Sequence, residues 1–301
     1  GLMFPIIPAN SAAADSGNTE GIFGFGYNTT ISNTNVTNLV SNVGVVGSDV
    51  AGVGTARSDL AATEYGGDKG IFSSNHNTQY TNLVSNTGVV ASDVAGVGTQ
   101  RSAPAGCEYG GDKGIFGFGK SGSSYLGMTN LVSNAGVVAT DVSAVGTART
   151  GPAATEYGGD KGIFGFGWTG SSYLDETNLV SNTGVVSTDV TGVGTNRGWP
   201  AACGYGYDKG IFGYGHMGAD VSMTNLISNV GVVASDVAGV GNARYLVPAC
   251  EYGEDKGIFG YGRDDGSYVS MTNLVSNTGV VASDVAGVGT GRQGAAACSF
   301  N

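Results

Sequence analysis

The chain has 301 residues, 12% of them charged, and carries a net charge of −11 at pH 7. Its few Lys and Arg residues form no cluster, which excludes the basic patch that nucleic-acid binding requires. No apolar run approaches the ~18–20 residues of a membrane-spanning helix, so we expect neither a nucleic-acid partner nor membrane insertion.

The first segment, residues 1–18, is an N-terminal arm with no counterpart in the rest of the chain. Its two prolines favour an extended form, and residues 9–18 are small and polar, as in a tether. Exposing a large apolar side chain to water costs about 1.5–3 kcal/mol. We therefore expect the arm to dock on a neighbouring subunit, with folding back over its own chain as the alternative. The apolar residues of this assembly arm are Leu2, Met3, Phe4, Ile6 and Ile7.

From residue 19 onward, a cassette of about 48 residues recurs six times. Each copy contains Gly-Ile-Phe, then Thr-Asn-Leu, then a Val-Gly-x-x-Arg ending. The Thr-to-Arg distance is 20 residues in all six copies, whereas the Gly-to-Thr distance varies from 11 to 16 residues. A copy this short must stack on its neighbours to bury its apolar face, so residues 19–301 are predicted to form a single domain.

Four short segments of the third copy have the composition of β-strands and are separated by Gly- and Asn-rich turns, at 105–109, 114–119, 129–133 and 137–142. In the second segment, Phe116 and Phe118 fall on one face and glycines on the other. We expect these rings to pack into the glycine hollows of the next sheet. Four strands per cassette predict an all-β fold, a six-bladed β-propeller of four-stranded blades; a linear solenoid is the alternative.

The two ends of the chain favour the propeller. The first copy lacks the first strand of the cassette, while the last residues of the chain match that strand. Residues 295–300 are therefore predicted to complete the N-terminal blade and close the ring, which removes exposed sheet edges. The predicted blades span about 19–57 plus 293–301, 58–101, 102–149, 150–197, 198–244 and 245–292.

Residues 149–167, from the repeat arginine to the aromatic strand that ends in glycine, resemble the kelch repeat. The resemblance covers about residues 19–300 and implies a propeller, but the Gly-Gly doublet and the tryptophan of the fourth strand are missing. The cassettes also resemble repeats in structural proteins of aquatic phages and environmental sequences. That second resemblance implies a structural role, with a location outside the cell or on a virion surface.

The candidate chemical groups are few. His76 and His216 lie in non-equivalent loops and have no partners for a metal or catalytic site. The cysteines share one strand position, and positions related by rotation about the ring axis do not face one another, so we expect small buried thiols without disulfides. These cysteines are Cys107, Cys203, Cys250 and Cys298. We expect no cofactor, no bound metal and no catalytic residues.

Charged residues recur at fixed places in the cassette. An Asp stands eight residues before each repeat arginine, and an Asp-Lys pair marks the turn after the first strand in five copies. We expect ion pairs between neighbouring blades or turn hydrogen bonds, with a cation held by a ring of acids as the alternative.

Most sequence variation falls in the loops of one predicted face, which also holds aromatic residues and carboxylates. Such a mixture suits a carbohydrate or protein ligand. The candidate binding residues are Trp168, Tyr173, Trp199, Tyr245 and Tyr268. Two sequons in or beside the first of these loops make Asn28 and Asn35 candidate glycosylation sites.

Three functional hypotheses follow. The leading one is a non-enzymatic building block of an extracellular or virion-surface assembly, whose partners are further copies of the chain or other surface proteins. The second is a lectin-like module that binds glycans on the variable face. A polysaccharide-active enzyme is the least favoured.

Overall fold

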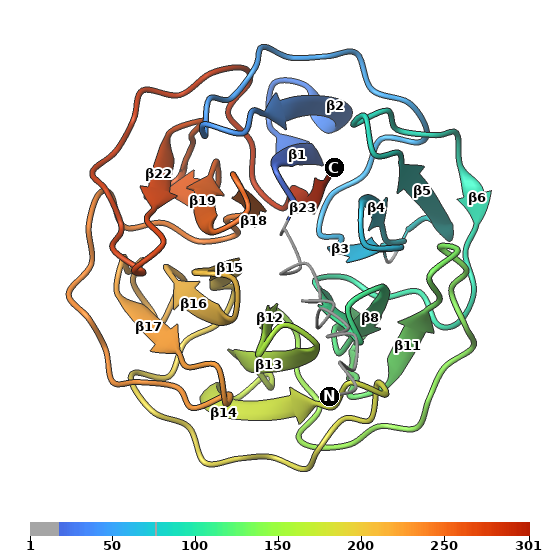
Figure 1. Cartoon of the computed structure of the whole chain (residues 1–301), viewed down its shortest axis with the longest axis vertical. Helices are drawn as coiled ribbons and strands as arrows, with labels where there is room; N and C mark the ends of the chain where they lie inside the picture. The colour runs from blue at the N-terminus through green and yellow to red at the C-terminus, as the bar shows by residue number, and fades with distance from the viewer. Residues whose placement is uncertain (1–17, 76) are drawn as a thin grey trace, which may run out of the picture.

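The computed structural model describes residues 18–75 and 77–301, and within these ranges the protein is all-β, without helices. Most strands belong to six small antiparallel sheets, which lie around a common axis (Figure 1). Each sheet has an inner, a middle and an outer strand, counted from the axis outward. The N-terminal arm and His76 lie outside the described residues, apart from Asn18.

The inner strands follow the first predicted strand of the cassette: β3 (Ala62–Tyr65), β7 (Ala105–Tyr109), β12 (Ala153–Tyr157), β15 (Ala201–Tyr205), β18 (Ala249–Tyr252) and β23 (Ala296–Phe300). The middle strands are β1 (Glu20–Asn28), β4 (Lys69–Phe72), β8 (Lys113–Gly117), β13 (Lys161–Trp168), β16 (Lys209–Gly213) and β19 (Lys256–Gly260). The outer strands are β2 (Ser32–Val40), β5 (Tyr80–Val84), β11 (Thr129–Val132), β14 (Tyr173–Val180), β17 (Thr224–Ile227) and β22 (Thr272–Val275).

The remaining strands are two residues long. They are β6 (Val94–Ala95), the hairpin of β9 (Lys120–Ser121) with β10 (Ser124–Tyr125), and the hairpin of β20 (Arg263–Asp264) with β21 (Ser267–Tyr268).

The C-terminal strand belongs to the same sheet as the N-terminal strands. β23 pairs antiparallel with β1, with Cys298 opposite Ile22, so the strand predicted from residues 295–300 is present and adjoins the first copy. Two or three residues before each inner strand, one residue donates its backbone N–H to the carbonyl of its counterpart in the preceding copy, over 2.7–3.3 Å. The sixth of these bonds joins the first copy to the last and closes the ring. This inner ring consists of Asp59, Ala103, Gly151, Trp199, Leu246 and Gly294.

The fourth strand predicted for every cassette is largely absent from the described residues. Only the sheet of β3, β4 and β5 has a fourth strand, β6. Elsewhere the segment touches the outer strand at isolated bridges such as Val40 with Val46 and Thr37 with Val50. The two bridges are three residues apart on β2 but four residues apart on the segment, so the segment contains one extra residue that bulges out of register. The side-chain amide of Asn38 fills this gap by donating to the carbonyl oxygen of Gly47 over 3.0 Å.

Neighbouring sheets pack through the predicted glycine hollows, but the prediction that Phe116 and Phe118 share one face is wrong. Phe118 has a φ of +63°, which breaks the alternation, and its ring packs against Phe164 of the next sheet. Phe116 instead packs with Ile71 of the preceding sheet. A Cβ atom on Gly165 of β13 would lie only 2.8 Å from the ring of Phe212 in the next sheet, so the ring fills the space that the glycine leaves open. Cys107 packs in the same way against Gly162. All four cysteines are buried and free, as predicted.

A buried arginine also joins each pair of neighbouring sheets. Arg197 places its guanidinium carbon 4.0 Å from the ring centre of Phe166 in its own copy. Its Nη2 donates to Asn225 of the next copy over 2.6 Å, and its Nη1 lies 3.9 Å from Asp236. Asp236 in turn accepts hydrogen bonds from the backbone N–H and the hydroxyl of Thr195. The recurring Asp therefore binds a neighbouring sheet, as predicted.

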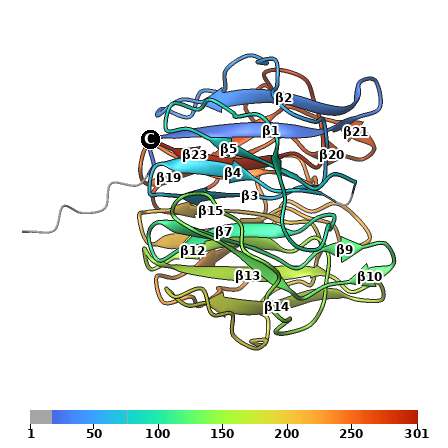
Figure 2. The same ribbon diagram turned by 90° about the vertical axis from the view of Figure 1, so that its right-hand side faces the viewer.

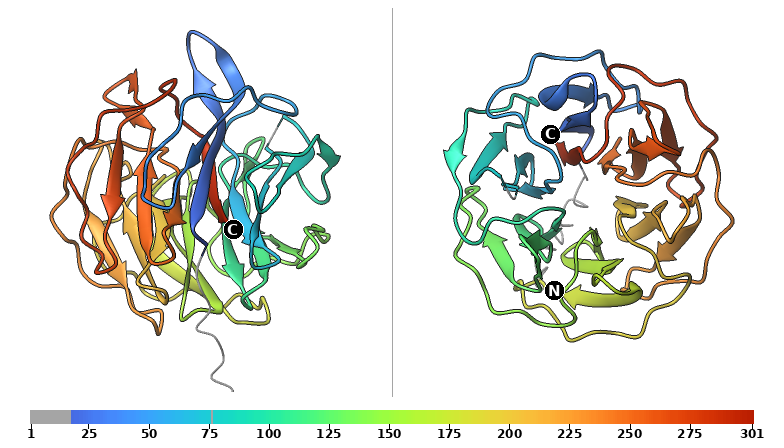
Figure 3. Two further views of the ribbon diagram at one scale, coloured as in Figure 1. Left: turned by 45° about the horizontal axis from the view of Figure 1, so that its top comes forward. Right: turned by 180° about the vertical axis from the view of Figure 1, so that it is seen from behind.

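Two opposite faces result from this arrangement. The hairpins β9–β10 and β20–β21 project on one side in the edge-on view, whereas the C-terminus lies on the other (Figure 2). We name the first side the loop face, since it carries the connections between middle and outer strands. The second is the turn face, which carries the turns between inner and middle strands. The views in Figure 3 show the same ring tilted and from behind.

Candidate functional site

A row of five aromatic side chains lies on the loop face, across three neighbouring sheets. Trp168 and Tyr173, at the facing ends of β13 and β14, have ring centres 4.5 Å apart. Tyr173 lies 6.1 Å from His216, and His216 lies 5.1 Å from Tyr245. Tyr245 is 6.4 Å from Trp199. The structure therefore brings together four of the five predicted binding residues and adds His216. We call this set the aromatic row.

The rings of the aromatic row are half-buried, which differs from the exposed positions that the loop sequences suggest. The cause is their contact with one another, because edge-to-face and tilted packing covers part of each ring.

An acidic groove adjoins the aromatic row at His216. It has a volume of about 640 Å³ and is lined by His216, Gly218, Ala219, Asp220, Asn242, Ala243, Asp264 and Asp265. Three of these residues carry a carboxylate and none is Lys or Arg.

Hydrogen bonds hold the polar side chains of the acidic groove in place. Nδ1 of His216 lies 2.7 Å from Oδ1 of Asp220. Oδ2 of Asp220 accepts a hydrogen bond from the backbone N–H of Asp265 over 3.3 Å. Asn242 donates its side-chain amide to Asp264 over 3.3 Å. These bonds link the loop after β16 to the β20–β21 hairpin, so two sheets build the groove together.

The other predicted site residues lie elsewhere. Tyr268 is outside the aromatic row and packs against Tyr27, with ring centres 5.9 Å apart. The side-chain amide of Asn28 donates to the carbonyl of Gly291, and that of Asn35 donates to the carbonyl of Gly54. In both candidate glycosylation sites, the nitrogen that would carry a sugar is thus engaged in a hydrogen bond. The assembly arm residues Leu2, Met3, Phe4, Ile6 and Ile7 lie outside the described residues.

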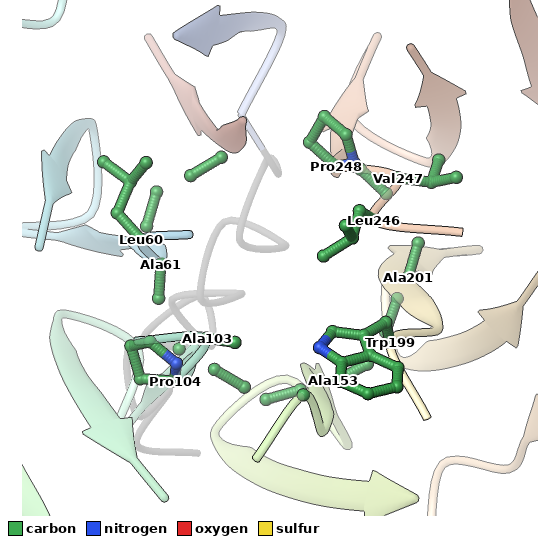
Figure 4. A pocket seen from close by; sticks show the side chains of 18 of the residues that line it. Leu60, Ala61, Ala103, Pro104, Ala153, Trp199, Ala201, Leu246, Val247 and Pro248 are labelled. Atoms are coloured by element: carbon green, nitrogen blue, oxygen red, sulfur yellow. The ribbon is translucent and has the colours of Figure 1, made fainter. Parts of the chain in front are cut away.

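A second hollow lies on the axis, where the channel between the sheets opens on the loop face. This axial basin has a volume of about 120 Å³, and every copy contributes residues from the start of its inner strand (Figure 4). Its lining is mostly apolar and includes Leu60, Pro104, Pro152, Trp199, Leu246 and Val247.

Five glutamates line the opposite end of the channel, toward the turn face, and four of them, which we call the channel carboxylates, lie on inner strands. These channel carboxylates are Glu64, Glu108, Glu156 and Glu251. Burial raises the pKa of Glu251 well above its usual range, and the nearby charges of Glu156 and Glu64 raise it further. Burial likewise raises the pKa of Glu64, although a hydrogen bond from the Ser299 backbone opposes the shift. In the described part of the chain, no group of three or more His, Cys, Asp and Glu side chains is arranged to hold a metal ion.

Sequence reasoning misses two of these features. The channel carboxylates could be found from the alternation of the inner strands, since Cys107 and Tyr109 face the neighbouring sheet and Glu108 must then face the axis. His216 gives no such signal, because Asp220, its partner four residues away, lies in a loop whose shape no periodic pattern predicts.

No protein-family model and no curated protein matches this chain. Among the described residues, no helix is long and apolar enough to cross a membrane.

Proposed function

We infer that the six sheets form a six-bladed β-propeller of the kelch-like kind. The hydrogen bonds of the inner ring and the pairing of β23 with β1 support this inference, since both link the last copy to the first. A linear solenoid would leave the first and last copies without such contacts.

We propose further that the protein is a non-enzymatic, lectin-like module that binds carbohydrate on the loop face. The observation that carries this proposal is the aromatic row ending at the acidic groove. Aromatic rings offer an apolar surface for the C–H groups of a sugar ring, with a polar edge. Carboxylates beside them accept hydrogen bonds from sugar hydroxyls, and charged acceptors make stronger bonds than neutral ones.

The charge of the groove selects the class of sugar. Asp220, Asp264 and Asp265 lie together without a Lys or Arg in the lining. An anionic sugar would be repelled there, whereas a neutral hexose or a protonated amino sugar would not. The volume of about 640 Å³ lies within the range of small-molecule sites and fits a short oligosaccharide.

A glycan array with the full-length protein tests the proposal. We expect binding to neutral or amino-sugar oligosaccharides, and calorimetry with the best ligand should show at least a tenfold loss of affinity in Trp168→Ala and in Asp220→Asn. Tyr268→Ala is the matched control, because Tyr268 is an aromatic residue of the same face outside the row. No binding to any glycan, or equal losses in all three variants, would contradict the proposal. Turnover of a bound polysaccharide would contradict its non-enzymatic part.

A second candidate function is that of a building block in an extracellular or virion-surface assembly of copies of this chain. The observation that favours it is a ring of valines on the turn face. The residue after each turn glycine is a valine that is 62–65% exposed, and these are Val45, Val89, Val137, Val185, Val232 and Val280. Apolar surface repeated in this way is typical of protein–protein contacts. The resemblance of the cassettes to repeats of phage structural proteins supports the location.

Sedimentation velocity of the full-length protein over a hundredfold range of concentration tests this second function. We expect oligomers whose size grows with concentration. Substituting Val89, Val137 and Val185 together by Asp should reduce their size, whereas a single species of monomer mass throughout would contradict the assembly.

A further inference from the structure

The axial basin has the properties of a receptor for an apolar segment. Its volume of about 120 Å³ approaches the ~150 Å³ of a cavity that accommodates benzene. Leu60, Trp199 and Leu246 come from three different copies and converge on it (Figure 4). It therefore has room for one large apolar side chain, with flanking residues on its rim.

The backbone N–H groups around the basin already have hydrogen-bond partners. The N–H groups of the inner ring donate to the carbonyl groups of the same ring around the axis, so these N–H groups are not free to bind a hydrophilic ligand. Prolines from four copies lack an N–H altogether, and these are Pro104, Pro152, Pro200 and Pro248.

The sequence of the chain supplies such an occupant. Residues 2–8 are all apolar. The first described residues lie at the turn face, where the carbonyl of Asn18 accepts from the N–H of Glu254 and that of Thr19 from the N–H of Gly253. Asn18 lines the same pocket as the channel carboxylates.

The position of Asn18 favours a second copy as the source of the segment. To reach its own basin through the channel, an apolar segment would have to pass Glu64, Glu108, Glu156 and Glu251. A copy stacked on the loop face presents its turn face, and hence its arm, directly above the basin. Residues 9–17 span up to about 30 Å when extended, enough to bridge the loops of the face.

We propose that residues 2–8 of one copy bind in the axial basin of the next, so that the copies stack head to tail along their axes. This inference deepens the assembly function proposed above and rests on it. The contact joins two different surfaces, so it does not close between two molecules and repeats along the stack. The exposed valines of the turn face would then lie against the loop face of the neighbour.

Complementation of two variants tests this contact. The arm variant carries Phe4→Asp and Ile6→Asp, and the basin variant carries Leu246→Asp, at a position whose φ of +53° Asp tolerates well. We expect each variant alone to sediment as a monomer. Mixed, they should form one-to-one dimers and nothing larger, since one intact arm meets one intact basin. Val94→Asp, at an exposed apolar residue of the outermost strand β6, is the control and should assemble as the parent protein does.

A peptide of residues 1–12 separates this inference from the assembly function. Fluorescence anisotropy should show the labelled peptide binding to the arm variant, and binding at least tenfold weaker once Leu246→Asp is added. If the parent protein and the basin variant assemble equally, the inference is overturned and the assembly function stands. If the parent stays monomeric, the assembly function fails; failure of the peptide to bind, or equal binding in both variants, overturns the basin as receptor.

Discussion

At the scale of single residues, glycine has two different roles in this chain. Gly165 leaves space for a ring of the next sheet, because a Cβ there would lie 2.8 Å from Phe212. No side chain fills the space beside Gly47: a Cβ there would contact only the carbonyl oxygen of Leu39, at an ordinary van der Waals distance of 3.5 Å. The corresponding residue in the other copies is Ala91, Ala139, Ser187, Ala234 or Ala282.

The same substitution at these two glycines should therefore have opposite effects. Gly165→Ala forces the Phe212 ring to move, and overpacking of this kind costs about 1–3 kcal/mol. Gly47→Ala removes freedom from the unfolded chain without a clash and should stabilise by about 0.4–1 kcal/mol. Urea unfolding followed by circular dichroism measures both. Equal midpoints for the two variants would show that the hollow is not tightly filled.

At the scale of strands and sheets, the faces of one strand can be predicted from its own sequence. Alternation alone assigns Phe116 and Gly117 to opposite faces, and the packing of the Phe116 ring follows from it. It assigns Phe118 to the wrong face, because the positive φ of Phe118 interrupts the alternation of the strand. The fourth strand is predicted wrongly because its valines have high β-propensity, while the Asn amide that interrupts its pairing lies on another strand. Four members of the aromatic row are predicted as binding residues, but the contacts between their rings are not, because Trp168 and Tyr245 are 77 residues apart and are brought to one row only by the placement of the sheets.

The arginine between neighbouring sheets should contribute strongly to their association. Arg197→Met would leave the buried side-chain oxygen of Asn225 without its donor, and an unsatisfied buried polar group of this kind costs about 1–3 kcal/mol. Arg263→Met, on the surface hairpin, should change stability by no more than about 0.5 kcal/mol. Chemical unfolding of both variants gives the comparison, and similar losses would contradict a special role of the buried arginine.

At the scale of the whole molecule, the channel and the sheet interfaces respond to pH in opposite directions. Each channel glutamate keeps some exposed surface, but the channel is narrow and the surrounding protein removes the carboxyl groups from bulk water. At the interfaces, burial acts to raise the pKa of Asp93, but hydrogen bonds from Thr55 and Asn82 outweigh it and hold the pKa below its usual value. Protonation of the channel glutamates therefore stabilises the folded protein, whereas protonation of the interface aspartates destabilises it.

The opposite pKa shifts of the interface aspartates and the channel glutamates predict that the free energy of unfolding is highest in mildly acid solution. Because the pKa of Asp93 is lowered on folding, its contribution is complete above the unfolded value of 3.8 and is lost as the pH falls below it. The pKa of Glu251 is raised on folding, so its contribution is complete below the unfolded value of 4.5 and is lost as the pH rises toward the folded value. Each unit of that increase corresponds to about 1.4 kcal/mol.

Urea unfolding between pH 3 and pH 8 should therefore give the highest midpoint near pH 4–5. Glu251→Gln keeps the shape of the side chain but cannot ionise, so it should match the parent at pH 4.5 and exceed it at pH 8. Asp265→Asn, at an exposed loop position, should follow the parent curve throughout. A parent midpoint that rises steadily from pH 4.5 to pH 8 would show that the channel carboxylates ionise without cost, and that the channel is open enough to hydrate them.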